Sequence, residues 1–502
     1  MPHRPVCEYV RRRYAAAPMP PLETSLLALL GPNRLLCSPD ALLAWECDGF
    51  TVHRSRPRAV VLPESTAEVQ AVLRLLHTAK VPFVPRGAGT CLSGGPTAGG
   101  DAVIVDLARM RKVLQISTVD LYAIVQPGVV NLDLTTAVHH HGLHYAPDPS
   151  SQSVCTIGGN LAENSGGPHC FKYGMTTDHV LGARIVLPDG SLVDVGSPAG
   201  PRAPHGLDLL AVFCGSEGTF GIATEITVRL CRDQQSVRTM LAAFSTMTAA
   251  CRTVSDIVAA GLVPAALEIL DQATIRAVEA SVYRAGYPEN AAAVLLVELD
   301  GPDFVLAEEA EEVRDYFRAH GALSVDEATT PTDRKRLWKG RKGAFGAMGR
   351  LNTDLYVLDG VVPRTRLEDA LTGIAAIGMK HGVVMTNVFH AGDGNLHPNI
   401  SFDGRDPEQT RRTIAAGREI LQLCVDLGGS ISGEHGIGTE KLDHVSMMFN
   451  AADLAVMARV RAVWNPTGLC NPGKVLPSRG ACAEVAKWPQ MVAKVLDVES
   501  DA

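Results

Sequence analysis

The sequence predicts an α+β protein of several domains, and three observations support this. Residues 58–63, 66–79 and 81–85 form a strand–helix–strand pattern. From 100 to 235, short apolar runs alternate with Gly and Pro, as in a strand-rich domain. From 236 to 425, longer helical patterns alternate with strands. Because the chain has 502 residues, we expect about three domains.

The first unit begins with an apolar run, 58–63, which Pro63 ends and which reads as a buried strand. Ser65 then starts a helix over 66–79 with its apolar residues at helical spacing. Residues 1–45 are expected to be helical and peripheral, with Asp40 capping a short helix through Trp45.

The remaining strands are predicted from short apolar runs between turn residues. They are expected at 103–106, 122–125, 180–187, 222–230, 293–298 and 383–389. We expect an N-terminal helical segment (1–50), a first domain (51–235), a second domain (236–425), a Gly-rich C-terminal segment (426–480) and a tail (481–502).

Composition excludes several classes of protein. Hydrophobic residues make up 46% and charged residues 20%, as in ordinary globular proteins. A formal net charge of −8 argues against a nucleic-acid surface. Long uncharged apolar runs are missing, so no membrane span is expected. Arg11, Arg12 and Arg13 could belong to a transit peptide, but a solvated helix start is preferred.

The 12 cysteines are scattered and form no CxxC pair. In a chain of this length we expect reduced, mostly buried thiols in a cytosolic compartment. The spacing also excludes an iron–sulfur cluster of the chain's own, because closely spaced thiolates are missing.

Three Gly-rich segments predict a ligand site. They read PRGAGTCLSGG (85–95), TIGGNLAENSGG (156–167) and GSEGTFG (215–221). Glycines allow close backbone approach, and successive N–H groups can hold phosphate oxygens. Arg86 can add charge, while Thr90 and Ser93 add hydroxyl groups. One such loop is an ordinary turn about as often as a site, but three together favour a long, diphosphate-containing ligand.

A histidine–carboxylate motif predicts a second site. HAGDGNLH (390–397) follows a strand-like run, and its GDGN turn should bring His390 and His397 together. GEHG (433–436) adds Glu434 and His435. Two imidazoles and a carboxylate suit a divalent metal with open positions, although a hydrogen-bonded turn explains the spacing equally well.

These motifs, with APDPS (146–150), resemble the FAD-binding domain of vanillyl-alcohol-oxidase (PCMH) type. More narrowly, the chain resembles the FAD-linked D-2-hydroxyacid dehydrogenases, the family of the bacterial glycolate oxidase flavin subunit. The resemblance spans about 45–474. It implies that 51–235 bind FAD, that 236–425 form an α+β cap (substrate) domain, and that 426–480 return to the flavin and metal. Some related flavoenzymes attach FAD covalently, but here the corresponding stretch has Thr90 and Cys91 and no His, so noncovalent FAD is expected.

The resemblance also implies which residues contact FAD. These are Pro85, Arg86, Gly87, Ala88, Gly89, Thr90, Ser93, Gly94, Pro147, Asp148, Pro149, Thr156, Gly159, Asn160, Ala162, Asn164, Gly166, Glu217, Gly218, Gly221, Ile222 and Asn471.

In this family the His/Glu motif holds a divalent metal, which makes His390, His397 and Glu434 the expected ligands of zinc or manganese. We expect His435 to bind substrate and to act as general base. The segment 338–345 matches the place of a substrate-binding Arg, here Arg341. The strand at 354–363 carries no Lys, unlike the 2-hydroxyglutarate enzymes, which favours a small monocarboxylate.

The expected function is FAD-dependent oxidation of a small D-2-hydroxy acid, glycolate favoured, with hydride transfer from C2 to flavin N5. A D-lactate dehydrogenase is the closest alternative. A flavin-free metallohydrolase and a noncatalytic FAD-binding subunit are alternatives of other classes.

The resemblance implies partners, namely a second FAD-type subunit and an iron–sulfur subunit. A homodimer is left open, and neither nucleic acid nor a direct membrane span is expected. The expected location is cytoplasmic, with peripheral attachment to the inner membrane only through such partners.

Overall fold

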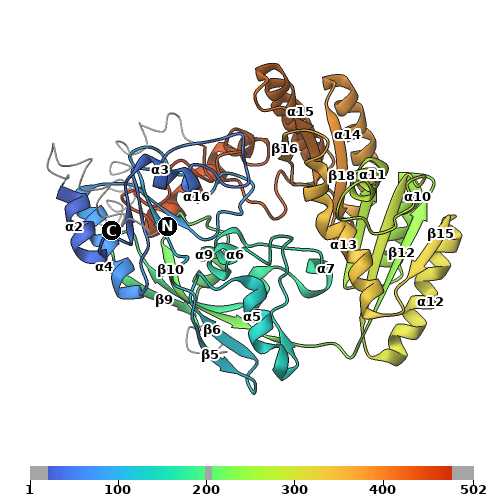
Figure 1. Ribbon diagram of the computed structural model, residues 1–502, viewed down its shortest axis with the longest axis horizontal. Coiled ribbons are helices and arrows are strands. Elements are labelled where there is room, and N and C mark those ends of the chain that lie inside the picture. The colour runs from blue at the N-terminus through green and yellow to red at the C-terminus, as the bar shows by residue number, and fades with distance from the viewer. Residues whose placement is uncertain (1–20, 198–205, 478–502) are drawn as a thin grey trace, which may run out of the picture.

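The computed structural model describes residues 21–197 and 206–477. Two bodies of mixed strands and helices lie side by side (Figure 1). Arg11, Arg12, Arg13, Cys7, Cys482 and the expected tail 481–502 lie outside the described residues.

The first body contains a four-stranded sheet in the order β1-β2-β4-β3. Its strands are β1 (Leu35–Leu36), β2 (Ala59–Val61), β3 (Phe83–Arg86) and β4 (Val103–Asp106). β2, β4 and β3 run parallel, because helix α4 (Thr66–Ala79) connects β2 to β3 as a crossover. Helix α2 (Pro21–Leu30) packs on α4. The loop that follows β3 is the first Gly-rich segment.

A five-stranded antiparallel sheet, in the order β5-β6-β10-β8-β9, completes the first body. Its strands are β5 (Val113–Ser117), β6 (Tyr122–Val125), β8 (Val180–Val186), β9 (Leu192–Gly196) and β10 (Ile222–Arg229). β7 (Leu143–His144) and β11 (Cys231–Arg232) form a separate pair. The helices are α3 (Pro39–Leu42), η1 (Leu43–Trp45), α5 (Asn131–Val138), η2 (His139–His141), α6 (Ile157–Glu163), α7 (Cys170–Tyr173), α8 (Thr176–His179) and α9 (Leu209–Phe213).

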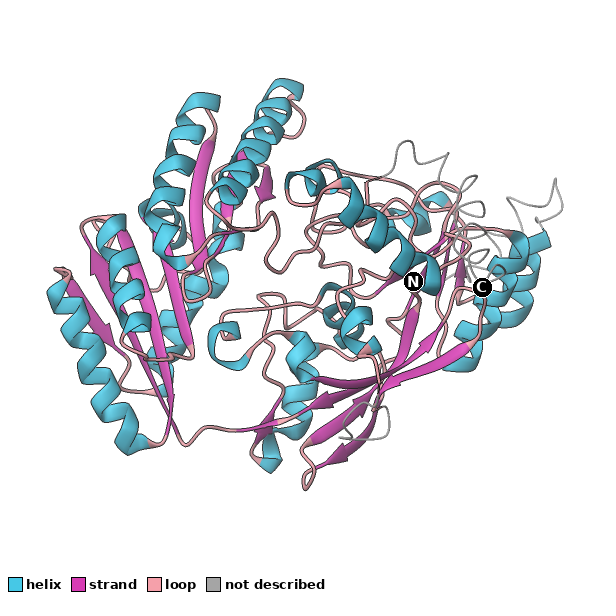
Figure 2. Ribbon diagram, turned by 180° about the vertical axis from the view of Figure 1, so that it is seen from behind, coloured by secondary structure: helices cyan, strands magenta, loops and turns pink. Residues whose placement is uncertain are grey.

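The second body is built on one large sheet, in the order β15-β12-β14-β13-β18-β19-β17, with β20 pairing β18 and β16. The strands are β12 (Ser236–Phe244), β13 (Ala266–Asp271), β14 (Ala293–Gly301), β15 (Ser324–Glu327), β16 (Asp354–Val357), β17 (Gly360–Val361), β18 (Val384–His390), β19 (Asn395–Leu396) and β20 (Pro398–Phe402). Figure 2 shows these strands as a group separate from those of the first body.

Helices cover both faces of this sheet, because alternate strand residues point to opposite sides. Leu295 and Val297 of β14 join a core with α10, α12, α14 and α15, whereas Val294 and Leu296 join a core with α11 and α13. The helices are α10 (Met247–Ala259), α11 (Gln272–Glu279), α12 (Asp303–Ala319), α13 (Pro331–Met348), η3 (Arg364–Arg366), α14 (Leu367–His381) and α15 (Pro407–Asp426).

After α15 the chain leaves the second body and returns to the first. It passes through η4 (Leu442–Met447) and α16 (Ala451–Trp464), and α16 lies among the N-terminal elements in Figure 1. Cys470 forms an isolated parallel β-bridge with Phe83 of β3. The Trp464 ring stacks on that of Phe220, with centroids 5.6 Å apart. This return carries residues 432–438 across the boundary between the bodies.

The α+β class is confirmed, and the expected strands and the helix over 66–79 form. Ser65 caps that helix, with its hydroxyl accepting from the Glu68 N–H group. The expectation that Asp40 caps the short N-terminal helix is wrong. Ser38 caps α3 through a bond from the Ala41 N–H group, because the helix begins at Pro39 and Asp40 lies inside its first turn.

The ten cysteines within the described ranges are all free. None of the described helices is both long and apolar enough to cross a membrane.

Candidate active site

One cavity of about 530 Å³ runs between the two bodies. The three Gly-rich segments line it from the first body, and Lys342, Phe345, Leu355 and Val357 line it from the second. At one end it reaches a cluster made of His397, Glu434 and His435. A pocket of this size suits an organic cofactor with a small substrate beside its reactive part.

The Gly-rich walls fit a ligand that needs close backbone approach. A Cβ added to Gly87 would lie 2.4 Å from Thr156 Oγ1, so the first and second loops can meet only because position 87 is glycine. Fourteen of the 22 residues expected to contact the cofactor line the cavity. They are Pro85, Arg86, Gly87, Ala88, Gly89, Thr90, Pro149, Thr156, Gly159, Asn160, Ala162, Gly166, Glu217 and Gly218.

The other eight do not line the cavity, and most of them have structural contacts instead. They are Ser93, Gly94, Pro147, Asp148, Asn164, Gly221, Ile222 and Asn471. The Ser93 hydroxyl donates to the His435 carbonyl oxygen at 3.0 Å. The Asn471 amide donates to the backbone oxygens of Gly95 and Glu217. Their contact with a cofactor stays a prediction.

The Arg86 side chain, at the start of the first Gly-rich loop, is buried and hydrogen-bonded to nearby backbone. It is 7% exposed, and one guanidinium nitrogen donates to the Cys47 carbonyl oxygen at 2.9 Å. Burial lowers the Arg86 pKa, and the carboxylates of Asp106 and Asp48 oppose that change. Its positive charge therefore offsets the buried carboxylates of Asp106 and Asp48, and its hydrogen bond fixes the backbone at Cys47. Arg86 also lines the cavity.

The expected meeting of His390 and His397 is confirmed. β18 and β19 form a tight hairpin in which His390 pairs with Asn395, and the Asp393 carboxylate accepts from the Asn395 N–H group. His397 lies two residues beyond Asn395, on the same side of the strand. The two imidazole centroids are 5.1 Å apart.

The two imidazoles point at one carboxylate oxygen. His390 Nε2 and His397 Nε2 lie 3.2 and 3.1 Å from Glu434 Oε1. Their Nδ1 atoms face other acceptors, with Glu268 Oε1 at 2.6 Å from His390 and the Leu358 carbonyl oxygen at 3.2 Å from His397.

This hydrogen-bond pattern fits a divalent cation. When Nδ1 of each ring donates its hydrogen, both Nε2 lone pairs face Glu434 Oε1, an arrangement that a cation between the three atoms stabilises. Burial lowers the pKa of His390, but the carboxylates of Glu268 and Glu434 outweigh it and raise that pKa well above its usual range.

A second group of possible ligands, formed by Asp359, His397 and His435, does not fit a metal equally well. The Asp359 carboxylate already accepts from the N–H groups of Gly433, Glu434 and His435 and from the Lys441 ammonium. Since its lone pairs are occupied, this group is a poorer candidate than His390, His397 and Glu434.

His435 lies beside the metal-type cluster and lines the cavity. Its ring stacks on that of His397, with centroids 5.0 Å apart and planes 7° apart. Burial lowers the His435 pKa to about 4, and the charge of Asp359 opposes this only in part. The imidazole is therefore neutral near pH 7 and can accept a proton.

Arg341 is more deeply buried than a simple substrate contact requires. It is 1% exposed, and its Nε donates to Glu268 Oε2 at 2.5 Å. One terminal nitrogen, Nη2, is buried without a hydrogen-bond partner among the described residues. Lys342, the next residue, lines the cavity instead.

Sequence reasoning missed Glu268, which joins Arg341 to His390. The antiparallel register of β13 and β18 places Glu268 directly opposite His390. The carboxylate of Glu268 in the middle of the apolar strand 266–271 was the available signal, because a buried charge requires a partner.

Comparison with known proteins identifies related chains. The family described as "FAD binding domain" matches residues 57–196, and "FAD linked oxidases, C-terminal domain" matches 233–475. The glycolate oxidase subunit GlcD of Escherichia coli K12 is 45% identical over 450 residues, 90% of each chain. The D-lactate dehydrogenase of Anaerostipes hadrus is 30% identical over 89% of this chain and 95% of its own length.

Among solved structures, p-cresol methylhydroxylase superposes with a TM-score of 0.76 at 17% identity, covering 91% of this chain and 96% of its own. 4-Ethylphenol oxidase from Gulosibacter chungangensis gives a TM-score of 0.75 at 18% identity, covering 91% and 97%. These likenesses confirm the vanillyl-alcohol-oxidase-type fold.

The buried Arg341–Glu268 pair predicts a stability effect. Glu268→Gln leaves Arg341 charged and without its counter-ion in a dry environment, which typically costs about 3–5 kcal/mol. The thermal unfolding midpoint should fall by several degrees in differential scanning calorimetry. Glu311→Gln is the control, because Glu311 pairs with Arg314 and Arg318 on the surface and should leave the midpoint nearly unchanged. Equal midpoints for the two variants would contradict the pairing.

Proposed function

The chain belongs to the family of FAD-linked oxidases, and we propose that it is an FAD-dependent 2-hydroxyacid dehydrogenase whose substrate is glycolate. One observation carries this proposal. The cavity that the FAD-type loops line is also lined by His397, Glu434 and the neutral His435, and His390 contacts Glu434 beside it. The identity to a glycolate oxidase subunit supports glycolate.

We propose that FAD is held noncovalently. Cys91 lines the cavity, but burial and the nearby Glu163 carboxylate raise the pKa of its thiol well above the usual range. A protonated thiol is a poor nucleophile toward the flavin ring. Flavin that stayed on the acid-precipitated protein would contradict this proposal and identify Cys91 as the attachment point.

Three residues of the cluster would hold a divalent metal, zinc or manganese: His390, His397 and Glu434. When bound, FAD would supply the acceptor, flavin N5, for a hydride from substrate C2. A divalent metal at this site would supply a Lewis acid that lowers the pKa of the substrate hydroxyl. His435 then accepts the hydroxyl proton, and we assign this role to Nε2 because Nδ1 is buried without a partner among the described residues.

We propose Arg341 as the cation that meets the substrate carboxylate, through the unpaired Nη2. Lys342 is the second candidate, since it lines the cavity and Arg341 does not. Lys342→Gln distinguishes the two residues. An unchanged KM for glycolate supports Arg341, and a clearly raised KM assigns the contact to Lys342.

Two other functions explain less of the molecule. A flavin-free metallohydrolase would use the same His/Glu cluster but leaves the Gly-lined cavity without a ligand. A noncatalytic FAD subunit leaves the neutral His435 beside the cluster without a role. D-Lactate dehydrogenase remains the second candidate, because relatives with that name cover most of this chain.

The substrate prediction is tested with a panel of 2-hydroxy acids and an artificial electron acceptor. We expect glycolate to give the highest kcat/KM, D-lactate to follow, and L-lactate and D-2-hydroxyglutarate to react poorly. Val357, which lines the cavity, offers no charge for a second carboxylate. A higher kcat/KM for D-lactate than for glycolate would make D-lactate the proposed substrate. A colourless protein that reacts with no member of the panel would contradict the proposed function.

The metal prediction concerns His397. His397→Ala removes one of three ligands, so metal content and turnover should fall together while FAD content stays normal. Metal is measured by plasma emission spectroscopy and FAD by absorbance. His381→Ala is the control, since His381 pairs with Glu419 at the surface of the second body. Normal metal content in His397→Ala would contradict the assignment.

The general-base prediction concerns His435. His435→Ala should slow reduction of bound FAD by glycolate about 10²–10⁴-fold, the usual contribution of a general base. The rate is read in an anaerobic stopped-flow instrument from the fall in flavin absorbance. A loss smaller than about tenfold would place the proton acceptor elsewhere.

We also propose partner subunits, namely a second FAD-type subunit and an iron–sulfur subunit that carry electrons onward. The relative's name, a subunit of glycolate oxidase, supports this. The isolated chain should reduce artificial dyes quickly but quinone slowly until partners are added. Full-speed quinone reduction by the isolated chain, with no iron–sulfur protein in gentle purification, would contradict it. On this proposal the enzyme is cytoplasmic and reaches the inner membrane only through its partners.

A further inference from the structure

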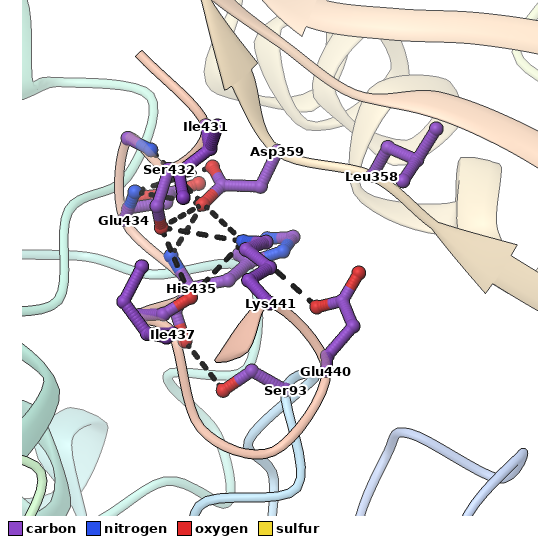
Figure 3. Close-up of polar contacts among 12 residues, drawn as sticks. Ser93, Leu358, Asp359, Ile431, Ser432, Glu434, His435, Ile437, Glu440 and Lys441 are labelled. Carbon is purple, nitrogen blue, oxygen red and sulfur yellow. Dashed lines mark hydrogen bonds and ion pairs between the residues drawn. The ribbon is translucent and has the colours of Figure 1, made fainter. Parts of the chain in front are cut away.

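The segment that carries Glu434 and His435 is gathered around one carboxylate of the second body. Asp359 lies between β16 and β17 and is fully buried. The backbone N–H groups of Gly433 and His435 lie 3.0 and 2.9 Å from its Oδ2 atom, and that of Glu434 lies 3.2 Å from both oxygens. Figure 3 shows these contacts converging on Asp359.

Three successive N–H groups that face one anion form a nest, a backbone concavity that binds an anion. The Lys441 ammonium adds a contact to Oδ2 at 3.2 Å and donates to the Gly436 carbonyl oxygen at 3.0 Å. The path of residues 433–436 is therefore determined by Asp359 and Lys441. That path decides where the side chains of Glu434 and His435 point.

The first body holds the other side of the same turn. Glu217 accepts from the N–H groups of Ile437 and Gly438, both at 2.6 Å. Gly436 has a φ of +80°, and a Cβ there would lie 2.6 Å from Glu163 Oε2. The turn is therefore packed closely against the first body on one side and bonded to Asp359 on the other.

Resting on the proposed function, we propose that Asp359 is a positioning residue for the reaction. By holding the backbone of residues 433–435, it fixes the Glu434 carboxylate toward His390 and His397 and the His435 imidazole toward the substrate hydroxyl.

A simpler role for Asp359 would be to neutralise the buried Lys441. Glu440 offers a matched comparison, because its side chain is 1% exposed and its Oε2 atom lies 3.9 Å from the same ammonium. Glu440 interacts with the Tyr356 hydroxyl, whereas the N–H groups of residues 433–435 all donate to Asp359. The two carboxylates therefore share the charge role, and only Asp359 holds the loop.

The test compares Asp359→Asn with Glu440→Gln in the full-length holoenzyme. An asparagine offers one neutral oxygen in place of two charged ones and turns an NH₂ group toward the other side of this donor set, so the anchor of the loop is weakened. We expect flavin reduction at saturating glycolate to slow about 100-fold, as a misplacement of about 1 Å can do. Metal retained after dialysis should fall in the same variant, while FAD content is unchanged. Glu440→Gln should stay within about threefold of the unsubstituted enzyme in rate and should keep its metal.

If the two variants lose rate and metal alike, Asp359 acts by charge alone and the proposal fails. Should Asp359→Asn not fold, the double variant Asp359→Asn/Lys441→Met removes both buried charges and is measured instead. A folded double variant with slow flavin reduction and poor metal retention supports the proposal. A double variant that reduces flavin at the normal rate overturns it.

The unsubstituted enzyme separates this inference from the proposed function. If glycolate and D-lactate both fail to reduce its FAD, the proposed function fails. Metal retention alone then still decides between Asp359 and Glu440. If the unsubstituted enzyme is reduced and Asp359→Asn is reduced equally fast with full metal content, only the positioning role fails.

Discussion

Two buried carboxylates on opposite sides of one turn determine how the two bodies form a single site. Asp359 of the second body accepts from the N–H groups of residues 433–435, and Glu217 of the first body accepts from those of 437 and 438. Each carboxylate replaces the water that these N–H groups would bind in an unfolded chain, so neither can be lost without leaving buried donors unpaired. The turn between them carries Glu434 and His435. A site of this kind exists only when both bodies contribute.

The rest of the site follows from sheet register. The pairing of β13 with β18 places Glu268 opposite His390, and the β18–β19 hairpin brings His397 to the same side. Glu268 then links His390 to the buried Arg341. These strands set the cluster at the end of the cavity that the Gly-rich loops of the first body line. The chemistry is thus placed where a flavin bound by those loops and a small hydroxy acid would meet.

What the sequence predicts well is local. Ser65 and the helix after it depend on neighbouring residues, and the meeting of His390 and His397 depends on a four-residue turn. Contacts between distant residues were not accessible in this way. Ser93 looked like a phosphate-binding hydroxyl, yet it bonds the carbonyl of His435, 342 positions away. Asp359 lies in an apolar run and showed no partner in the sequence around it. Its hydrogen-bond donors come from a turn more than seventy residues later. Pairings of this kind are set by the assembled fold, which no local pattern encodes.

The central claim is that the cluster beside the cavity holds a 2-hydroxy acid and takes the proton of its hydroxyl group, while a hydride passes directly from C2 to bound FAD. Its most direct test is single-turnover flavin reduction, without oxygen or any acceptor, using glycolate that carries deuterium at C2. The account predicts that ordinary glycolate bleaches the flavin fully and that the deuterated form does so clearly more slowly, because the C2–H bond breaks in the observed step. Flavin that stays oxidised with both glycolate and D-lactate, or that bleaches at the same rate with either isotope, would contradict it.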